Sequence, residues 1–210
     1  MATDPAGAEL RAVLHVGLTG NVAAGKSAVA ALFRRWGATL IDADEIVREL
    51  QAPHSSLLAA IAARFGGEVL RADGSLERAA LRALVLRDPA ELAALNAIMH
   101  PAVAARRREL VTAARRRGDR IVVSDIPLLF EADDPTTFDA VVLVDAPEPV
   151  RRARLAERGL PAGEAERLMA AQQPAAGKRS RSDYVIDNVG DLTALEHSAR
   201  AVWQALLARA

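Results

Sequence analysis

The apolar residues of this chain follow two spacings that alternate along its length. Short continuous apolar runs, typical of buried strands, occur at residues 13–16, 38–41, 120–124, 138–144 and 184–186. Helical spacing follows the first run, where positions i, i+3, i+4 and i+7 are Val29, Leu32, Phe33 and Trp36. A second amphipathic pattern covers residues 192–208. Strands that alternate with helices predict an α/β protein with a five-stranded, parallel, doubly wound sheet.

The stretch from about 53 to 118 interrupts this alternation, because its apolar residues follow helical spacing throughout. One of its helices begins at the capping-box pattern of residues 88–91. We expect that helix to kink or break at His100-Pro101, since proline lacks the N–H and clashes with the preceding turn. The expected organisation is one domain, with a core at about 13–52, 119–148 and 183–208, a helical insert at about 53–118 and a lid at about 149–182.

A phosphate-binding loop is predicted between the first strand and the first helix. Its residues match the pattern G-x-x-x-x-G-K-S and read Gly20, Asn21, Val22, Ala23, Ala24, Gly25, Lys26 and Ser27. Backbone N–H groups of such a loop and the following helix N-terminus favour phosphate. Lys26 is then placed to reach the β- and γ-phosphates of ATP, and the Ser27 hydroxyl to ligate Mg²⁺. A glycine-rich turn can match this pattern by chance, but the flanking strand and helix favour the functional interpretation.

Acidic residues follow two other predicted strands. Asp42 and Asp44 come after the second strand, and Asp125 follows the third. Ligands bind beyond the carboxyl ends of strands in open α/β sheets, so these carboxylates are expected at the phosphate loop's edge of the sheet. An aspartate after a strand also caps the helix that begins there, and we expect one of the pair Asp42 and Asp44 to serve each purpose.

The segment from Pro149 to Arg181 is rich in arginine. Arg151, Arg154 and Arg158 are spaced i, i+3 and i+7, which places three guanidinium groups on one helix face. Further cations at 178–181 are expected in a loop before the last strand. A solvated basic face is the simpler interpretation, but a neutral protein that concentrates cations in one segment favours a local anionic partner. We expect a hinged lid that closes over phosphates, with its break at residues 159–161.

Composition excludes several classes of protein. Lys and Arg number 27, as do Asp and Glu, so no global basic field favours nucleic acid. The chain has no cysteine, which excludes disulfides and thiolate metal sites, and its four histidines lack metal-ligand spacing. Neither a signal-peptide core in residues 1–11 nor an apolar run of about 18 residues is present. We therefore expect a cytoplasmic protein without membrane or nucleic-acid partners.

Several separated motifs recur in the order found in one family. They include residues 17–20 and 25–27, 41–44 with Arg48, His100-Pro101, 125–131, Arg154-Leu155 with Arg158, Gln173, Lys178, and 183–190. With these motifs the chain resembles dephospho-CoA kinase, a P-loop kinase, over roughly residues 13 to 207. The resemblance implies ATP-dependent phosphorylation of the ribose 3′-hydroxyl of dephospho-CoA, which gives coenzyme A and ADP. The family loop commonly reads Gly-Gly-Ile-Gly-Ser-Gly-Lys, so Asn21, Ala23 and Ala24 depart from it.

The resemblance also implies roles for individual residues. Asp44 is the candidate base or hydroxyl-orienting group, with Lys26, Arg154 and Arg158 as the other catalytic candidates. The loop from Gly20 to Ser27 is expected to bind ATP with Mg²⁺ on Ser27, and Asn188 and Gly190 to border its adenine. The helical insert is expected to hold the pantetheine of the acceptor. The expected acceptor-binding residues are Thr19, Asp44, Arg48, His100, Asp125 and Leu128. A structural role beside the proline stays equally open for His100, and a role at the waters of the metal stays open for Asp125.

Two other functions stay open at this point. Another small-metabolite P-loop kinase would share the loop, but does not predict the segment 127–131 or so large a helical insert. A GTP-binding switch would explain the D-x-x-G match at 187–190, but that match lies far from the loop and no N-K-x-D segment exists. The sequence does not decide the oligomeric state.

Overall fold

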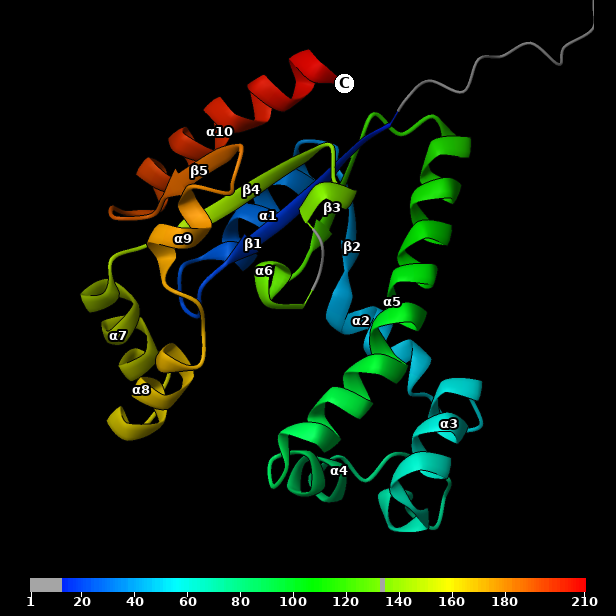
Figure 1. Ribbon diagram of the computed structural model, residues 1–210. Helices are drawn as coiled ribbons and strands as arrows, with labels where there is room; N and C mark the ends of the chain where they lie inside the picture. Colours follow the sequence, from blue (N-terminus) through cyan, green and yellow to red (C-terminus); the bar gives the residue numbers. More distant parts are fainter. Residues whose placement is uncertain (1–12, 133–134) are drawn as a thin grey trace, which may run out of the picture. The chain divides into compact units, whose positions relative to one another are not determined.

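A parallel sheet with the phosphate loop at its centre forms the larger part of the fold (Figure 1). The computed structural model describes residues 13–132 and 135–210, so the expectation about a signal segment in residues 1–11 lies outside the described residues. The strand order is β2-β3-β1-β4-β5. The strands are β1 (Leu14–Gly20), β2 (Thr39–Asp42), β3 (Ile121–Asp125), β4 (Ala140–Asp145) and β5 (Tyr184–Asp187). The predicted five-stranded parallel sheet is confirmed.

The middle of the sheet is covered on its faces by helices, which explains its continuous apolar runs. Val16 and Leu18 of β1 and Val142 of β4 have no exposed surface. Helices α1 (Lys26–Arg35) and α10 (Leu192–Arg209) pack against this core and against each other. An aromatic cluster joins them, with the ring of Trp203 5.5 Å from Phe33 and 6.2 Å from Trp36 between centroids. This packing anchors the C-terminal end of α1, the helix whose first residue is Lys26 of the phosphate loop.

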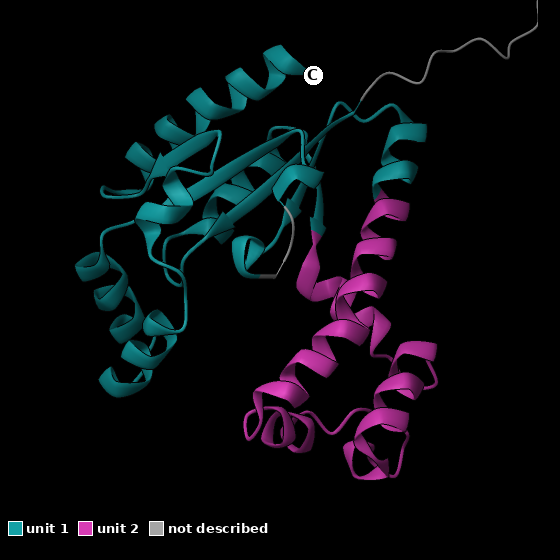
Figure 2. Cartoon of the chain, in the orientation of Figure 1, with its two compact units in different colours: residues 1–41, 111–210 teal, residues 42–110 magenta. Residues whose placement is uncertain are grey.

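The chain divides into two compact units, residues 1–41 with 111–210, and residues 42–110 (Figure 2). The smaller unit contains α2 (Ala43–Leu50), α3 (Ser56–Phe65), η1 (Gly67–Val69), α4 (Arg78–Val85) and most of α5 (Pro89–Arg117). Its helices bury a separate apolar cluster that includes Leu58, Ile61 and Met99. The unit therefore has a core of its own.

A kink or a break was predicted at Pro101, and the break is wrong. Helix α5 runs from Pro89 to Arg117 with Pro101 inside it. Apolar residues on both sides of the proline, Met99 before it and Val103 after it, pack into the cluster of the smaller unit. Proline in a helix interior costs about 3 kcal/mol, and the burial of apolar residues on both sides of it offsets that cost. The predicted start is confirmed, because Asp88 Oδ1 accepts a hydrogen bond from Ala90 N at 2.8 Å.

Short helices complete the larger unit. They are α6 (Leu129–Ala132), η2 (Pro135–Thr137), α7 (Glu148–Glu157), α8 (Ala162–Ala170) and α9 (Ala175–Arg179). The expected break at 159–161 separates α7 from α8. Lys178 and Arg179 were expected in a loop, but they belong to α9. Within the described ranges, no helix combines the length and the apolar character that a membrane span needs.

Candidate active site

The phosphate loop connects the carboxyl end of the central strand to α1. Ala24 N donates to Asn21 O at 3.0 Å, and Ala28 N donates to Gly25 O at the same distance, so the loop is a closed turn. Gly25 has a φ of +103°, a backbone conformation that glycine adopts readily and residues with a side chain rarely adopt. A Cβ on Gly20 would lie 2.6 Å from the carbonyl oxygen of Val144, so only glycine fits where β1 passes β4. The structure therefore explains why both fixed positions of the motif, 20 and 25, are glycine.

Lys26 is held at the sheet's carboxyl edge by an acidic side chain. Its Nζ donates to Asp125 Oδ1, and the two side chains are largely buried, with 16% and 14% of their surface exposed. Asp125 ends β3, the strand beside β1, so the pairing follows from the strand order. The structure thus brings together two residues that the sequence placed 99 positions apart. The carboxylate holds the ammonium group where the loop ends.

Arg154 and Asn188 bind the outer side of the same loop. Arg154 Nη1 donates to the carbonyl oxygens of Ala23 and Ala24 at 3.2 and 3.3 Å. Its Nη2 donates to Asn188 Oδ1 at 3.1 Å, and Asn188 Nδ2 donates to Ala24 O at 2.8 Å. Both residues therefore lie against the phosphate loop. Their role in binding ATP or the transferring group stays a prediction.

We expect Gly25→Ala to disrupt the loop. A Cβ would lie 2.1 Å from Asn188 Nδ2, and a residue with a side chain loses about 1–2 kcal/mol in the left-handed region. The variant should have a lower melting temperature and a KM for ATP raised at least about tenfold, since ~1.4 kcal/mol corresponds to a factor of ten. Gly177→Ala is the control, because a Cβ there meets nothing within 4 Å and helix α9 gains about 1 kcal/mol of propensity. Equal ATP affinity in both variants would contradict this account.

Ala23 stands where the family loop commonly has glycine, and its side chain makes an additional contact. It has a φ of +60°, which residues other than glycine rarely adopt. Its methyl group is buried against Leu155 of α7 and Ala165 of α8. The loop is therefore tied to the predicted lid by apolar packing as well as by Arg154. The sequence flagged Ala23 as a departure but gave no sign of this contact.

The segment between α8 and α9 reaches the loop through Gln172, which the sequence analysis missed. Gln172 Oε1 accepts a hydrogen bond from Val22 N, a loop N–H, at 2.8 Å. The next residue is anchored, since Gln173 N donates to Glu131 Oε1 at 3.1 Å and Gln173 Nε2 to Phe130 O at 3.3 Å. Lys178 has no exposed surface, and its Nζ lies 2.7 Å from the same Glu131 oxygen. These contacts fix the segment, and explain why Lys178, which was expected in a loop, is buried.

Two other cations of the arginine-rich segment have different surroundings. Arg179 donates to Asp187 Oδ1 at 2.6 Å and to Asp145 Oδ2 at 2.8 Å. Those two carboxylates, Asp187 first, hold the pKa of the Arg179 guanidinium above its ordinary value. Arg179 therefore stays charged and ties α9 to the ends of β4 and β5. Arg158 is exposed at the C-terminal cap of α7.

The residues expected at the metal and at the acceptor side of the larger unit are also located. Ser27 is exposed in the first turn of α1. No group of three or more metal-ligating side chains occurs in residues 13–132 and 135–210. Mg²⁺ in kinase sites keeps several waters and binds substrate phosphates, and the role expected for Ser27 stays a prediction. Thr19 Oγ1 donates to Pro127 O at 3.3 Å, and Leu128 is 43% exposed. Gly190 is exposed after β5.

The smaller unit carries the remaining candidates. Asp42 caps α2, because its Oδ1 accepts hydrogen bonds from Asp44 N at 2.8 Å and Glu45 N at 3.3 Å. The capping role expected for one of the two aspartates thus belongs to Asp42, and the Asp44 carboxylate is exposed in the first helical turn. Arg48 is exposed, and its Nε donates to Asp44 O at 3.2 Å. His100 is exposed on α5. Asp44 is therefore available for chemistry, and its role as the base stays a prediction.

Comparison with known proteins identifies the family. The family model for dephospho-CoA kinase matches residues 14–194. The chain belongs to the dephospho-CoA kinase family. A dephospho-CoA kinase of Frankia casuarinae is 46% identical over 198 residues, which cover 92% of this chain and 84% of that protein. One from Streptomyces avermitilis is 46% identical over 199 residues, 94% of this chain and 96% of that protein. The crystal structure of TT1252 from Thermus thermophilus superposes with a TM-score of 0.78 at 36% identity, covering 92% and 98% of the two chains. Membership of this family confirms the expected P-loop kinase fold and the resemblance drawn from the motifs.

Proposed function

We propose that this chain transfers the γ-phosphoryl group of ATP to the ribose 3′-hydroxyl of dephospho-CoA, giving coenzyme A and ADP. The observation that carries the proposal is Lys26, held by Asp125 at the end of a glycine-bounded loop on the central strand. A phosphoryl group in transfer needs positioning and neutralised charge more than covalent chemistry from the protein. The loop N–H groups, Lys26 and the α1 N-terminus supply both for a triphosphate.

The remaining steps follow from the candidates already located. ATP phosphates compete with Asp125 for the Lys26 ammonium, so Asp125 is released toward the acceptor or the waters of the metal. Bound Mg²⁺ on Ser27 supplies further neutralisation of phosphate charge. Asp44 orients the 3′-hydroxyl and receives its proton as the new O–P bond forms and the bond to the ADP oxygen breaks. The insert at 53–118 binds the pantetheine, with His100 at its inner edge. Arg48, which precedes the insert, also contacts the acceptor, and the segment 149–182 acts as the lid. The protein works in the cytoplasm.

The direct test is release of ADP from ATP and Mg²⁺ with dephospho-CoA present or absent. We expect release that depends on dephospho-CoA, and its loss when EDTA removes the metal, with recovery on added Mg²⁺. GTP in place of ATP should support much slower turnover. Equal release with a simple nucleoside or shikimate as acceptor would favour another small-metabolite kinase. Nucleotide binding without any acceptor-dependent turnover would refute the proposal.

A lid variant tests whether the exposed arginine of α7 acts on the transferring group. Arg158→Lys keeps the charge but loses the planar fork that binds phosphate oxygens in pairs. We expect kcat to fall about tenfold or more while the KM for ATP changes little, because contacts made in the closed transition state act on kcat. Arg167→Lys on the exposed side of α8 is the matched control and should retain parent kinetics. Equal kcat in the two variants would mean that Arg158 belongs to a solvated basic face and does not act on the transferring group.

A further inference from the structure

One peptide group of the phosphate loop, which joins Asn21 to Val22, is hydrogen-bonded at both ends. Its carbonyl oxygen, on Asn21, accepts from Ala24 N at 3.0 Å and so closes the turn. Its N–H, on Val22, donates to Gln172 Oε1 at 2.8 Å. The carbonyl and the N–H of a planar trans peptide point in opposite directions. Gln172 therefore orients the carbonyl that closes the loop, although it lies 150 residues further along the chain.

The N–H groups of the loop fall into two sets. Those of Val22 and Ala24 are used within the protein, by Gln172 and by the Asn21 carbonyl. In residues 13–132 and 135–210 no hydrogen-bond partner occurs for the N–H groups of Ala23, Gly25, Lys26 and Ser27. Free N–H groups of a glycine-rich loop and a helix N-terminus bind phosphate oxygens. Gln172 thus holds the first part of the loop and leaves the later N–H groups for a ligand.

A buried ion pair holds the backbone that carries Gln172. Lys178 of α9 has no exposed surface, and its Nζ lies 2.7 Å from Glu131 Oε1 of α6. The same oxygen accepts a hydrogen bond from Gln173 N at 3.1 Å. A lysine is costly to bury unless its charge is paired, so this pair fixes where α9 and the preceding segment lie on α6. The Gln172 side chain therefore extends to the loop from a fixed backbone.

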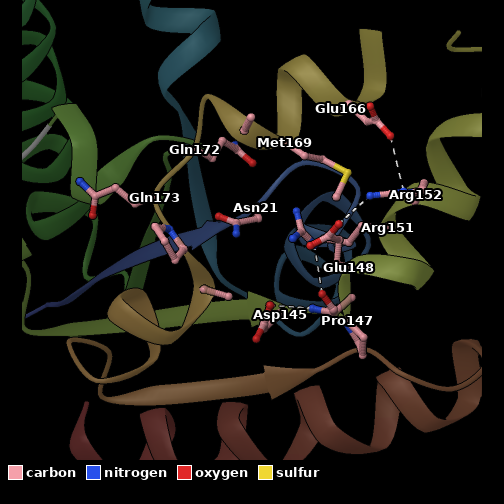
Figure 3. A pocket seen from close by; sticks show the side chains of 14 residues that line it. Asn21, Asp145, Pro147, Glu148, Arg151, Arg152, Glu166, Met169, Gln172 and Gln173 are labelled. Atoms are coloured by element: carbon pink, nitrogen blue, oxygen red, sulfur yellow. Dashed lines mark hydrogen bonds and ion pairs between the residues drawn. The ribbon is translucent and has the colours of Figure 1, made fainter. Parts of the chain in front are cut away.

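We propose that Gln172 is a positioning residue for nucleotide binding, which presets the loop conformation whose free N–H groups take the phosphates of ATP. The inference rests on the nucleotide site of the proposed function. A loop that is ordered beforehand binds more tightly, because the ligand does not have to offset the entropy of ordering it. Gln172 lies at the wall of a cavity of about 580 Å³, which Asn21 and Arg151 also line (Figure 3). Truncation of its side chain therefore enlarges an open space and leaves the anchors of the segment in place.

The experiment measures the Kd of ATP and of ADP for the full chain by titration calorimetry. Gln172→Ala should stay folded and raise both Kd values about three- to tenfold, the factor that one net hydrogen bond supplies. At saturating ATP its kcat should stay near that of the parent, because the transferring group is not contacted. Gln172→Asn should be weakened alike, since its amide is one methylene too short to reach Val22. Gln204→Ala, which removes an exposed glutamine from α10, is the control and should bind like the parent.

A double variant tests whether the ion pair acts through Gln172. Lys178→Met removes the ammonium but keeps an unbranched side chain, and the Glu131 side chain is 18% exposed, so water reaches the carboxylate that loses its partner. We expect a higher Kd of ATP in this variant, because the segment loses an anchor. Lys178→Met with Gln172→Ala should bind no more weakly than Gln172→Ala alone, since residues that act through one contact are not additive. Additive losses would mean that Lys178 has a separate, structural role, and the Gln172 variants decide the inference where Lys178→Met does not fold.

Three results would overturn the inference. Unchanged Kd values in Gln172→Ala would mean that the loop is ordered without the amide. Lower Kd values would mean that the amide occupies an N–H that phosphate needs, so that Gln172 competes with the nucleotide. A fall in kcat with unchanged Kd values would place Gln172 on the transferring group. A parent that binds neither ATP nor ADP would remove the proposed function itself, which is a distinct outcome from equal binding by parent and variant.

Discussion

Lys26→Ala should lose at least about a hundredfold of kcat/KM for ATP. Each charge-assisted contact between an ammonium and a phosphate oxygen contributes roughly 1.5–3 kcal/mol, and ~1.4 kcal/mol is a factor of ten in rate. Lys26 is the side chain that Asp125 positions at the end of the loop, so its removal also takes the ammonium group away from that carboxylate. Added electrostatic repulsion between Asp125 and phosphate would lower ATP affinity further.

Arg34→Ala is the matched control for that experiment. Arg34 lies on the exposed side of the same helix, so its removal takes away one cation without touching the loop. Circular dichroism and thermal unfolding should show that both variants fold. Turnover of Lys26→Ala near the parent rate would contradict the assignment of the phosphate loop.

Asp44→Asn should lower kcat by about 10²–10⁴, which is the usual contribution of a positioned base. ATP should still bind, because the phosphate loop and its lysine belong to the other unit. Asparagine keeps the size of the side chain, and the capping of α2 depends on Asp42, so folding should be unaffected. The measurement is kcat with saturating ATP and dephospho-CoA, together with nucleotide binding in the absence of acceptor.

Two neighbours of Asp44 provide the controls. Glu45→Gln removes an exposed carboxylate from the same helical turn and should be close to the parent. Asp42→Asn should also be mild, because asparagine caps helices about as well as aspartate. A larger loss of kcat in Asp42→Asn than in Asp44→Asn would reverse the two assigned roles.

The sequence predicted the elements whose pattern is local. Apolar runs marked all five strands. In β1, β3 and β4 they reflect burial on both faces of a covered parallel sheet, whereas the edge strands β2 and β5 are only partly buried. The loop was predicted because its glycines and Lys26 form one contiguous motif. Local proline chemistry left a kink or a break open at Pro101. The break is wrong, because Met99 and Val103 beside the proline pack into a cluster whose other residues, such as Leu58 and Ile61, are distant in the sequence. Tertiary packing decided that helix.

Side chains with distant partners could not be placed from the sequence. The arginine spacing in α7 predicted three groups on one face, but the structure gives them different surroundings. Arg151 is buried at the cavity, Arg154 binds the loop carbonyls, and Arg158 is exposed. Gln172 carried no signal at all, because its partner Val22 is 150 residues away. Spacing fixes the direction of a side chain on its own helix, and only the fold decides what lies opposite.

The paired tryptophans of α1 and α10 have a practical consequence for measuring stability. Trp36 and Trp203 are the two tryptophans of the chain, and both report on the packing of the larger unit. The smaller unit has none, yet it contributes helices to the far-ultraviolet dichroism. Coincident denaturation curves from fluorescence and dichroism would mean that the two units unfold as one cooperative system. An earlier transition by dichroism alone would reveal that residues 42–110 melt while the nucleotide-binding sheet is still intact.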